Sequence, residues 1–317
     1  MKRSLFNAAT AALLLAVSAN LRADPVGELA AFSAFTKVDL AQLASGDAKT
    51  TRGPAMSTPR YLGVQSCWVA PGSPKQTAEA IRSWNPTQHP ELKILLHGNG
   101  SDFSRLQQAP DNGVVRALVS ATTSKSTSLQ ISRDEATRLP TSGSTMAGPV
   151  ADFWSTVLRK RAAAGPFGQP ACDYTGQQIR AGDEINGLLR QQPPIQKQFP
   201  GLIGGKGEQY WELTDIESKG VLSLGTSYSR SGANGTMQAA DVLYYASGGF
   251  YVGVTLYEMW PVEVGGKPST LVWRGDMTSA AEIGDLRGIE RLGAESMMLK
   301  DVSRAVRLFR RDTSGNR

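Results

Sequence analysis

Two histidines and a few carboxylates are the residues of this chain best suited to acid–base chemistry. His89 and His97 lie eight residues apart, and no Glu or Cys stands at the spacing of a zinc motif. His97 ends a strand-like run before Gly98, which fits either a general base or a solvated strand-end side chain. No Gly-x-Ser-x-Gly motif occurs, which excludes the α/β-hydrolase arrangement, although a triad assembled in space stays open. The sequence therefore predicts no metal site and assigns no catalytic residue.

Three carboxylates, Asp241, Glu258 and Asp276, lie in or beside predicted strands. A glycosidase needs two such groups facing each other across a cleft, which spacing alone does not indicate. Glu258 shares its strand face with Leu256 and Trp260, so an inward face would bury its charge and require a partner. Arg274 in the next strand is the expected partner. The pair is interpreted either as a structural ion pair or as a polar anchor inside a ligand cavity.

Tyrosines and tryptophans are concentrated in the same strands. Aromatic residues favour strands and cores, but Tyr and Trp also carry polar atoms that suit a lined pocket. If the aromatic face lines a pocket, the predicted ligand-binding residues are Trp211, Tyr244, Glu258, Trp260 and Arg274.

The second half of the chain predicts an antiparallel meander followed by a helix. Strand-like runs at 210–217, 221–229, 238–246, 250–262 and 269–276 are separated by Gly, Ser or Asn. Ser279 and Glu282 have capping-box spacing, and a long helix is expected to follow. Its inward face is expected to include Ile289, Met297 and Phe309.

The first half predicts mixed elements. We expect a helical entry segment, a strand at 60–70, a helix at 75–84 and a short strand at 92–97. Residues 98–149 are predicted to be mostly loops, and further helices are expected at 149–161 and 180–190. The region at about 98–209 is therefore interpreted as a loop-rich, partly helical insertion.

This order of elements resembles the helix-grip fold of START-like and polyketide-cyclase-like domains. The stretch from Tyr210 to Arg310 carries most of the likeness, and Arg60 to Trp84 matches the front. The resemblance implies an α+β fold in which a curved antiparallel sheet is covered by the long C-terminal helix, with a cavity for apolar ligands. It implies no catalytic set, so no functional residue is carried over. The chain also resembles an uncharacterised family of exported bacterial proteins.

The N-terminus predicts export. Lys2 and Arg3 precede an apolar run too short to span a bilayer, and small residues follow, which is typical of a cleavable signal peptide at 1–23. Residues 24–317 are then expected to form one α+β domain, periplasmic or secreted, without a transmembrane anchor. The net charge of +6 includes Lys2, Arg3 and Arg22, and no aromatic-interleaved basic motif indicates nucleic acid. No cofactor is implied.

Cys67 and Cys172 are the two cysteines of the chain. An oxidising compartment permits them to form a disulfide, and two separate buried thiols are the alternative.

Three functions follow from these patterns. The first is an exported protein that binds a hydrophobic or lipid-like small molecule between the sheet and the C-terminal helix. The second is a structural or protein-interaction module of the cell envelope, whose fully packed sheet would leave no cavity. The third is an envelope hydrolase, which convergence of carboxylates or of His97 in a cleft would favour. We expect a binding protein rather than an enzyme.

Overall fold

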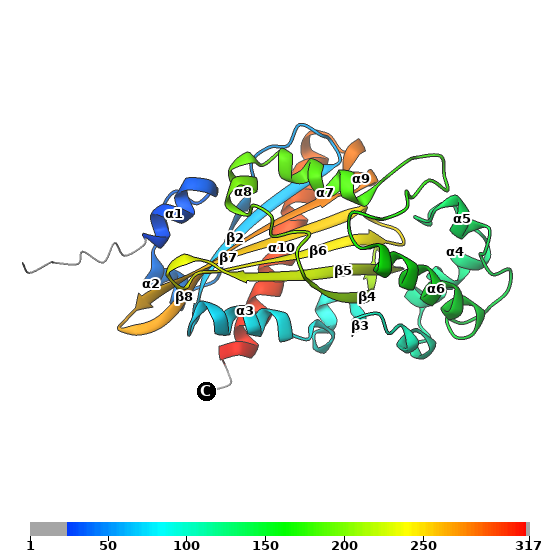
Figure 1. Cartoon of the computed structure of the whole chain (residues 1–317), viewed down its shortest axis with the longest axis horizontal. Helices are drawn as coiled ribbons and strands as arrows, with labels where there is room; N and C mark the ends of the chain where they lie inside the picture. The colour runs from blue at the N-terminus through cyan, green and yellow to red at the C-terminus, as the bar shows by residue number, and fades with distance from the viewer. Residues whose placement is uncertain (1–23, 315–317) are drawn as a thin grey trace, which may run out of the picture.

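Eight strands form one antiparallel sheet in the order β1-β2-β8-β7-β6-β5-β4-β3, in a computed structural model that describes residues 24–314 (Figure 1). The signal peptide predicted at 1–23 lies outside the described residues. The five strands of the predicted meander are all present, and the early strand β2 pairs with the last strand β8. The strands are β1 (Lys49–Arg52), β2 (Tyr61–Pro71), β3 (Ile94–Asn99), β4 (Glu208–Ile216), β5 (Lys219–Ser231), β6 (Met237–Ala246), β7 (Val252–Val264) and β8 (Lys267–Ser279).

Helices cover both faces of this sheet, so the chain has the predicted α+β class. In Figure 1, α7 and α8 lie on the near side of the strands, and α10 crosses behind them. The α-helices are α1 (Pro25–Phe32), α2 (Leu40–Ser45), α3 (Pro74–Ser83), α4 (Gly113–Thr123), α5 (Arg133–Ala136), α6 (Pro149–Ala164), α7 (Ala181–Arg190), α8 (Pro193–Gln198), α9 (Ala281–Asp285) and α10 (Gly288–Ser314). Short 3₁₀ turns are η1 (Pro86–Gln88), η2 (Pro90–Leu92), η3 (Ser104–Gln108) and η4 (Ala233–Gly235).

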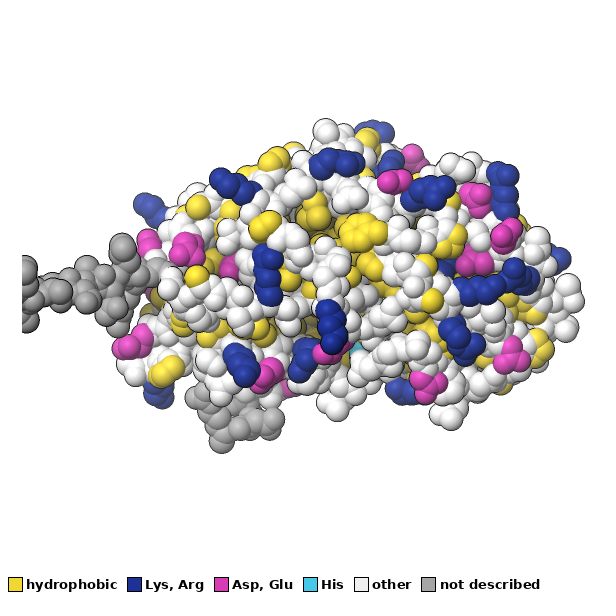
Figure 2. All heavy atoms as spheres, in the orientation of Figure 1, with side chains coloured by type: hydrophobic (Ala, Val, Ile, Leu, Met, Phe, Trp, Pro, Cys, Tyr) yellow, Lys and Arg dark blue, Asp and Glu magenta, His cyan; other side chains and the backbone are white. Residues whose placement is uncertain are grey.

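Strand alternation gives each face its own core. In β7, Leu256 and Trp260 face the layer that contains α1, α7 and α8, which we call the helical layer. Tyr257 and Met259 face the opposite side, where α3 and α10 pack, which we call the cavity face. Over the outer surface of the helical layer, basic and acidic side chains are interspersed (Figure 2). Because both faces are covered, residues of both parities are buried.

The long connection between β3 and β4 contains more helix than the sequence predicted. Residues 98–149 were expected to be loops, but α4 and α5 form there. Asn112 caps α4 by accepting a hydrogen bond from Val115 N–H, and the helix buries Leu118 and Val119 against β5. The helix was not predicted because its last turns contain Ser and Thr, which are more typical of turns. Thr122 instead bonds its own helix through Leu118 O.

The C-terminal helix begins later than predicted. Ser279 is the last residue of β8, and its hydroxyl donates to Glu184 rather than capping a helix. Ile289 and Met297 are 87% and 63% exposed, so two of the residues assigned to the inward face point to solvent. The sheet contacts the later turns, where Val302, Val306 and Phe309 are buried.

The two cysteines are free thiols, so the disulfide that the sequence left possible does not form. Cys67 is fully buried in β2 on the side of the helical layer, and burial raises its pKa to about 12. Cys172 lies in an isolated bridge with Ile179, and its Sγ donates to Gln130 O. The alternative of two separate buried thiols holds for their separation and for Cys67, whereas Cys172 is only half-buried.

Candidate functional site

A cavity of about 870 Å³ lies between the cavity face of the sheet, α3 and α10. Its walls combine apolar and aromatic side chains from both helices and strands with polar side chains that come mostly from the strands. The apolar and aromatic lining residues are Trp68, Ile81, Trp84, Pro86, Leu92, Ile94, Tyr210, Tyr257, Val302, Ala305, Val306 and Phe309.

A row of polar side chains crosses the strands that form one wall of this cavity. Ser227, Asp241, Thr255 and Asp276 are successive cross-strand partners from β5 to β8. Residues opposite each other in antiparallel strands share a face, so their side chains meet in pairs. The Ser227 hydroxyl donates to Asp241, and Thr255 Oγ1 donates to Asp276 Oδ1 at 3.0 Å.

Arg274 lines the cavity next to this row. Its Nε and Nη2 donate to the Asp276 carboxylate at 2.6–3.0 Å, and its guanidinium lies 5.6 Å from the centre of the Tyr257 ring. Asp276 is 7% exposed, so the pair is largely withdrawn from water. Such a charge-assisted, multiply bonded pair fixes Arg274 in place and satisfies most of its charge.

Asp241 has a different environment. Burial raises the pKa of its carboxyl, and the negative charges of Glu212 and Asp276 act in the same direction. The Ser227 hydrogen bond and the charge of Arg274 oppose this rise only in part. Its charged form is therefore less stabilised than that of an exposed aspartate.

His97 and Glu212 form a second polar group on the cavity wall. His97 Nδ1 lies 3.1 Å from Glu212 Oε1 and Nε2 lies 3.2 Å from Asn99 Oδ1. The hydrogen bond with Glu212 raises the pKa of the imidazole, and burial lowers it by less. The ring stacks on Tyr210 at 5.8 Å. Both ring nitrogens therefore face oxygen atoms, which favours an imidazole ring that is held in one orientation as a hydrogen-bond donor.

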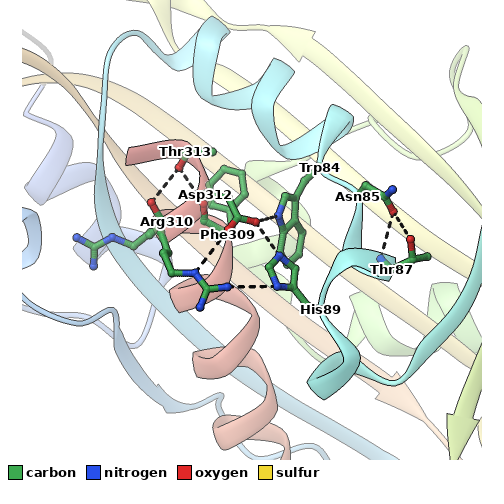
Figure 3. Close-up of polar contacts among 9 residues, drawn as sticks. Trp84, Asn85, Thr87, His89, Phe309, Arg310, Asp312 and Thr313 are labelled. Carbon is green, nitrogen blue, oxygen red and sulfur yellow. Dashed lines mark hydrogen bonds and ion pairs between the residues drawn. The ribbon is translucent and has the colours of Figure 1, made fainter. Parts of the chain in front are cut away.

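One end of α10 is held against the loop that follows α3. Trp84 Nε1 donates to Asp312 Oδ2 at 2.8 Å, and His89 Nε2 lies 2.7 Å from the same oxygen (Figure 3). The Phe309 ring packs edge-on against Trp84 at 5.9 Å. We call Asp312, Trp84 and His89 the Asp312 cluster. Since Trp84 and Phe309 both line the cavity, this cluster fixes part of its wall.

The structure separates the residues predicted to bind a ligand. Arg274 lines the cavity, but the other four face the helical layer, where they are at most 2% exposed. The predicted Glu258–Arg274 pair does not form. In the register of β7 and β8, Glu258 lies opposite Trp273 and Arg274 lies opposite Tyr257, so the two side chains point to opposite faces of the sheet. The four residues on the other face are Trp211, Tyr244, Glu258 and Trp260.

Glu258 finds its partners on the side of the sheet that faces the helical layer. Its carboxylate accepts hydrogen bonds from Gln238 Nε2 at 2.6 Å and from Gln198 Nε2 at 3.1 Å. Burial raises its pKa to about 7, although both hydrogen bonds lower it. The sequence left open whether Glu258 lies inward; it does lie among apolar neighbours, and its partners are two neutral amides.

Sequence reasoning missed most residues that line the cavity. Tyr210, Glu212 and Tyr257 were not proposed, and Asp241 was noted only as a carboxylate near a strand. One available signal was the alternation of residues along each strand, which determines the face to which each side chain points. Asp241, Thr255 and Arg274 alternate with the strongly apolar residues of their strands, and such positions face away from an apolar core.

Comparison with protein-family models, with curated proteins and with solved structures finds no match for this chain. Within residues 24–314, no group of three or more His, Cys, Asp and Glu side chains is placed to hold a metal ion. In the same part of the chain, no helix has the length and apolar character needed to cross a bilayer.

Proposed function

We propose that this protein binds a hydrophobic or lipid-like small molecule in the cavity between the sheet and α10. The observation that carries the proposal is the cavity itself, whose aromatic and aliphatic lining surrounds a row of polar side chains on the strands. Its volume of about 870 Å³ falls in the range of roughly 300–1,000 Å³ that is typical of small-molecule sites. A few polar groups in an apolar enclosure are suited to fix the orientation of an amphipathic ligand.

We propose further that the chain is a START-like, helix-grip domain. The order of elements supports this: β2 and α3 come first, then the meander β4–β8, and a long helix packs on the cavity face. The pairing of β2 with β8 brings the front of the chain beside its end. The helices between β3 and β4 and the helical layer are additions to the arrangement that the resemblance implies.

Export to the periplasm or the exterior is the third part of the proposal. It rests on the sequence of residues 1–23, where a basic start precedes a short apolar run.

The two alternative functions receive less support from this geometry. A fully packed interaction module predicts no cavity beneath α10. A hydrolase that uses His97 as its base needs a free ring nitrogen, whereas Nδ1 faces Glu212 and Nε2 faces Asn99 Oδ1.

The proposal is tested by filling the cavity. Ala305 lines it from α10, so Ala305→Trp should place an indole in the ligand space. Arg304→Trp on the exposed side of the same turn is the matched control. We expect the neutral fluorophore N-phenylnaphthylamine to bind the wild type and the control, and Ala305→Trp to bind it at least about tenfold more weakly.

Native mass spectrometry of protein purified without detergent, followed by organic extraction, is the complementary measurement. A reproducible co-purifying apolar compound, lost in Ala305→Trp, is the expected result. If no compound co-purifies and the fluorophore binds all three proteins equally or not at all, the binding proposal is wrong.

A further inference from the structure

The charged groups around the cavity are almost all arranged in pairs. Two arginines and one histidine each lie within 3.1 Å of a carboxylate. Asp301, on the rim, is 3.1 Å from Arg304. The three pairs are Arg82–Glu208, His97–Glu212 and Arg274–Asp276.

Asp241 is the exception. Among the described residues, no Lys, Arg or His nitrogen lies within 4.0 Å of its carboxylate, and its one side-chain hydrogen bond comes from Ser227. Arg274 is close enough for its charge to act on Asp241, but all of its hydrogen bonds go to Asp276. Asp241 therefore contributes an uncompensated carboxylate to the cavity.

The surroundings of Asp241 suit a ligand group. Asp241 and Ser227 line both the main cavity and a second hollow of about 350 Å³ beneath α3, so the carboxylate lies where the two adjoin. The pKa of the neighbouring Tyr210 hydroxyl is raised, mainly by burial and next by the charge of Asp241. Tyr210 is therefore neutral. Tyr210 and Tyr257 line the same cavity, and the faces of aromatic rings attract cations.

We infer that the ligand carries a positively charged nitrogen, an ammonium or amidinium group, that pairs with the Asp241 carboxylate. The apolar body of this ligand lies against the aromatic and aliphatic walls. This inference rests on the proposed binding function and adds the charge of the ligand to it.

The same charge distribution disfavours an anionic ligand such as a fatty-acid carboxylate. Arg274, whose charge acts on Asp241, already has Asp276 as its partner, and His97 and Arg82 are paired with Glu212 and Glu208. An anion in the main cavity would have to displace one of these carboxylates or lie beside the Asp241 carboxylate, whose like charge repels it. An ammonium group needs no such rearrangement, and it restores the charged form of Asp241.

The test compares three probes with one carbon skeleton: phenylbutylamine, phenylbutanol and phenylbutyrate, each substituted at the chain end. Binding is measured by calorimetry at a pH of about 8, where alkylamines are still protonated. We expect the amine to bind most tightly, and Asp241→Asn to weaken its binding by about tenfold or more while changing that of the alcohol by less than about twofold. Glu258→Gln is the matched control, because it removes a buried carboxylate from the opposite face. It should leave all three affinities unchanged.

Each outcome separates the inference from the proposed function. If the alcohol or the butyrate binds wild type as tightly as the amine does, the inference is overturned and the cavity remains a binding site. An unchanged affinity of Asp241→Asn for the amine has the same meaning. If none of the three probes binds while N-phenylnaphthylamine does, the inference alone is overturned, and if the fluorophore also fails to bind and no compound co-purifies, both are overturned. Should Asp241→Asn fail to fold, the order of affinities in the wild type still decides the question.

Discussion

The phenol ring of Tyr210 lies directly over Gly225 in the neighbouring strand, where a Cβ atom would come within 2.3 Å of Tyr210 Cζ. Because Gly225 has no side chain, the ring lies close to the sheet and lines the cavity beside His97. This contact ties the shape of the cavity to one backbone position.

Gly225→Ala should therefore disturb both stability and binding. The new methyl group forces the Tyr210 ring to move, and we expect the free energy of unfolding to fall by about 1–3 kcal/mol. Binding of N-phenylnaphthylamine should weaken as well. Gly253→Ala is the control, since its Cβ would meet only Leu243, at an ordinary 3.7 Å. Urea denaturation should show less than about 0.5 kcal/mol for this control. Equal losses in the two variants would contradict the role assigned to Tyr210.

Glu258 should make the protein less stable as the pH rises. Its pKa is raised from 4.5 to about 7 in the folded state. Below pH 4.5 the carboxyl is neutral in both states. Between 4.5 and about 7 the unfolded state loses its proton first, so ionisation favours unfolding. The shift corresponds to a loss of about 3 kcal/mol, complete above pH 7.

Glu258→Gln isolates this contribution, because an amide has no proton to lose in this range. We expect stability curves measured by urea denaturation from pH 4 to 8 to be flatter for the variant than for the wild type. Glu208→Gln removes a carboxylate that is 68% exposed, and it should keep the wild-type slope. A wild-type slope in Glu258→Gln would show that other groups cause the pH dependence.

The Asp312 cluster should hold the last turns of α10 in place. Asp312→Ala removes the acceptor of Trp84 Nε1 and of His89, whose side chain is only 7% exposed. Leaving buried donors without a partner costs about 1–3 kcal/mol. Hydrogen exchange should accelerate in the last turns of α10 and in η1–η2. Asp301→Ala breaks an exposed pair on the same helix and should change stability by less than about 1 kcal/mol. Unchanged exchange in Asp312→Ala would argue against this role.

Much of the fold could be predicted from the sequence, because alternation and glycine-rich turns mark the strands of the meander. The helix α6 was equally clear, since Val150, Trp154 and Leu158 repeat at helical spacing. The cap of α10 was not predictable from Ser279, because the hydroxyl bonds a residue 95 positions away, Glu184. Tertiary contacts of this kind override a local motif.

The site was harder to predict than the fold for a related physical reason. In each strand, the more apolar of the two alternating sets of residues faces the side with the tightest packing. Trp211 and Trp260 belong to that side. A cavity needs the opposite property, so its residues are the mixed polar and aromatic ones, such as Asp241 and Tyr257. Parity indicates which residues share a face. It does not indicate that a helix leaves space above one of the faces.

The Arg274–Asp276 pair should stabilise the cavity face through compensation of charge. Arg274→Met leaves the Asp276 carboxylate buried without its cation, and we expect a loss of about 3–5 kcal/mol at neutral pH. An unpaired buried carboxylate resists ionisation, so the loss should shrink as the pH falls towards about 4 and the group takes up a proton. Adding Asp276→Asn to Arg274→Met should recover part of the stability at neutral pH, because it removes the uncompensated charge. Denaturant unfolding of both single variants and the double variant at two pH values measures the coupling. A loss that is equal at both pH values, or that the second substitution fails to reduce, would show that Arg274 acts by packing alone.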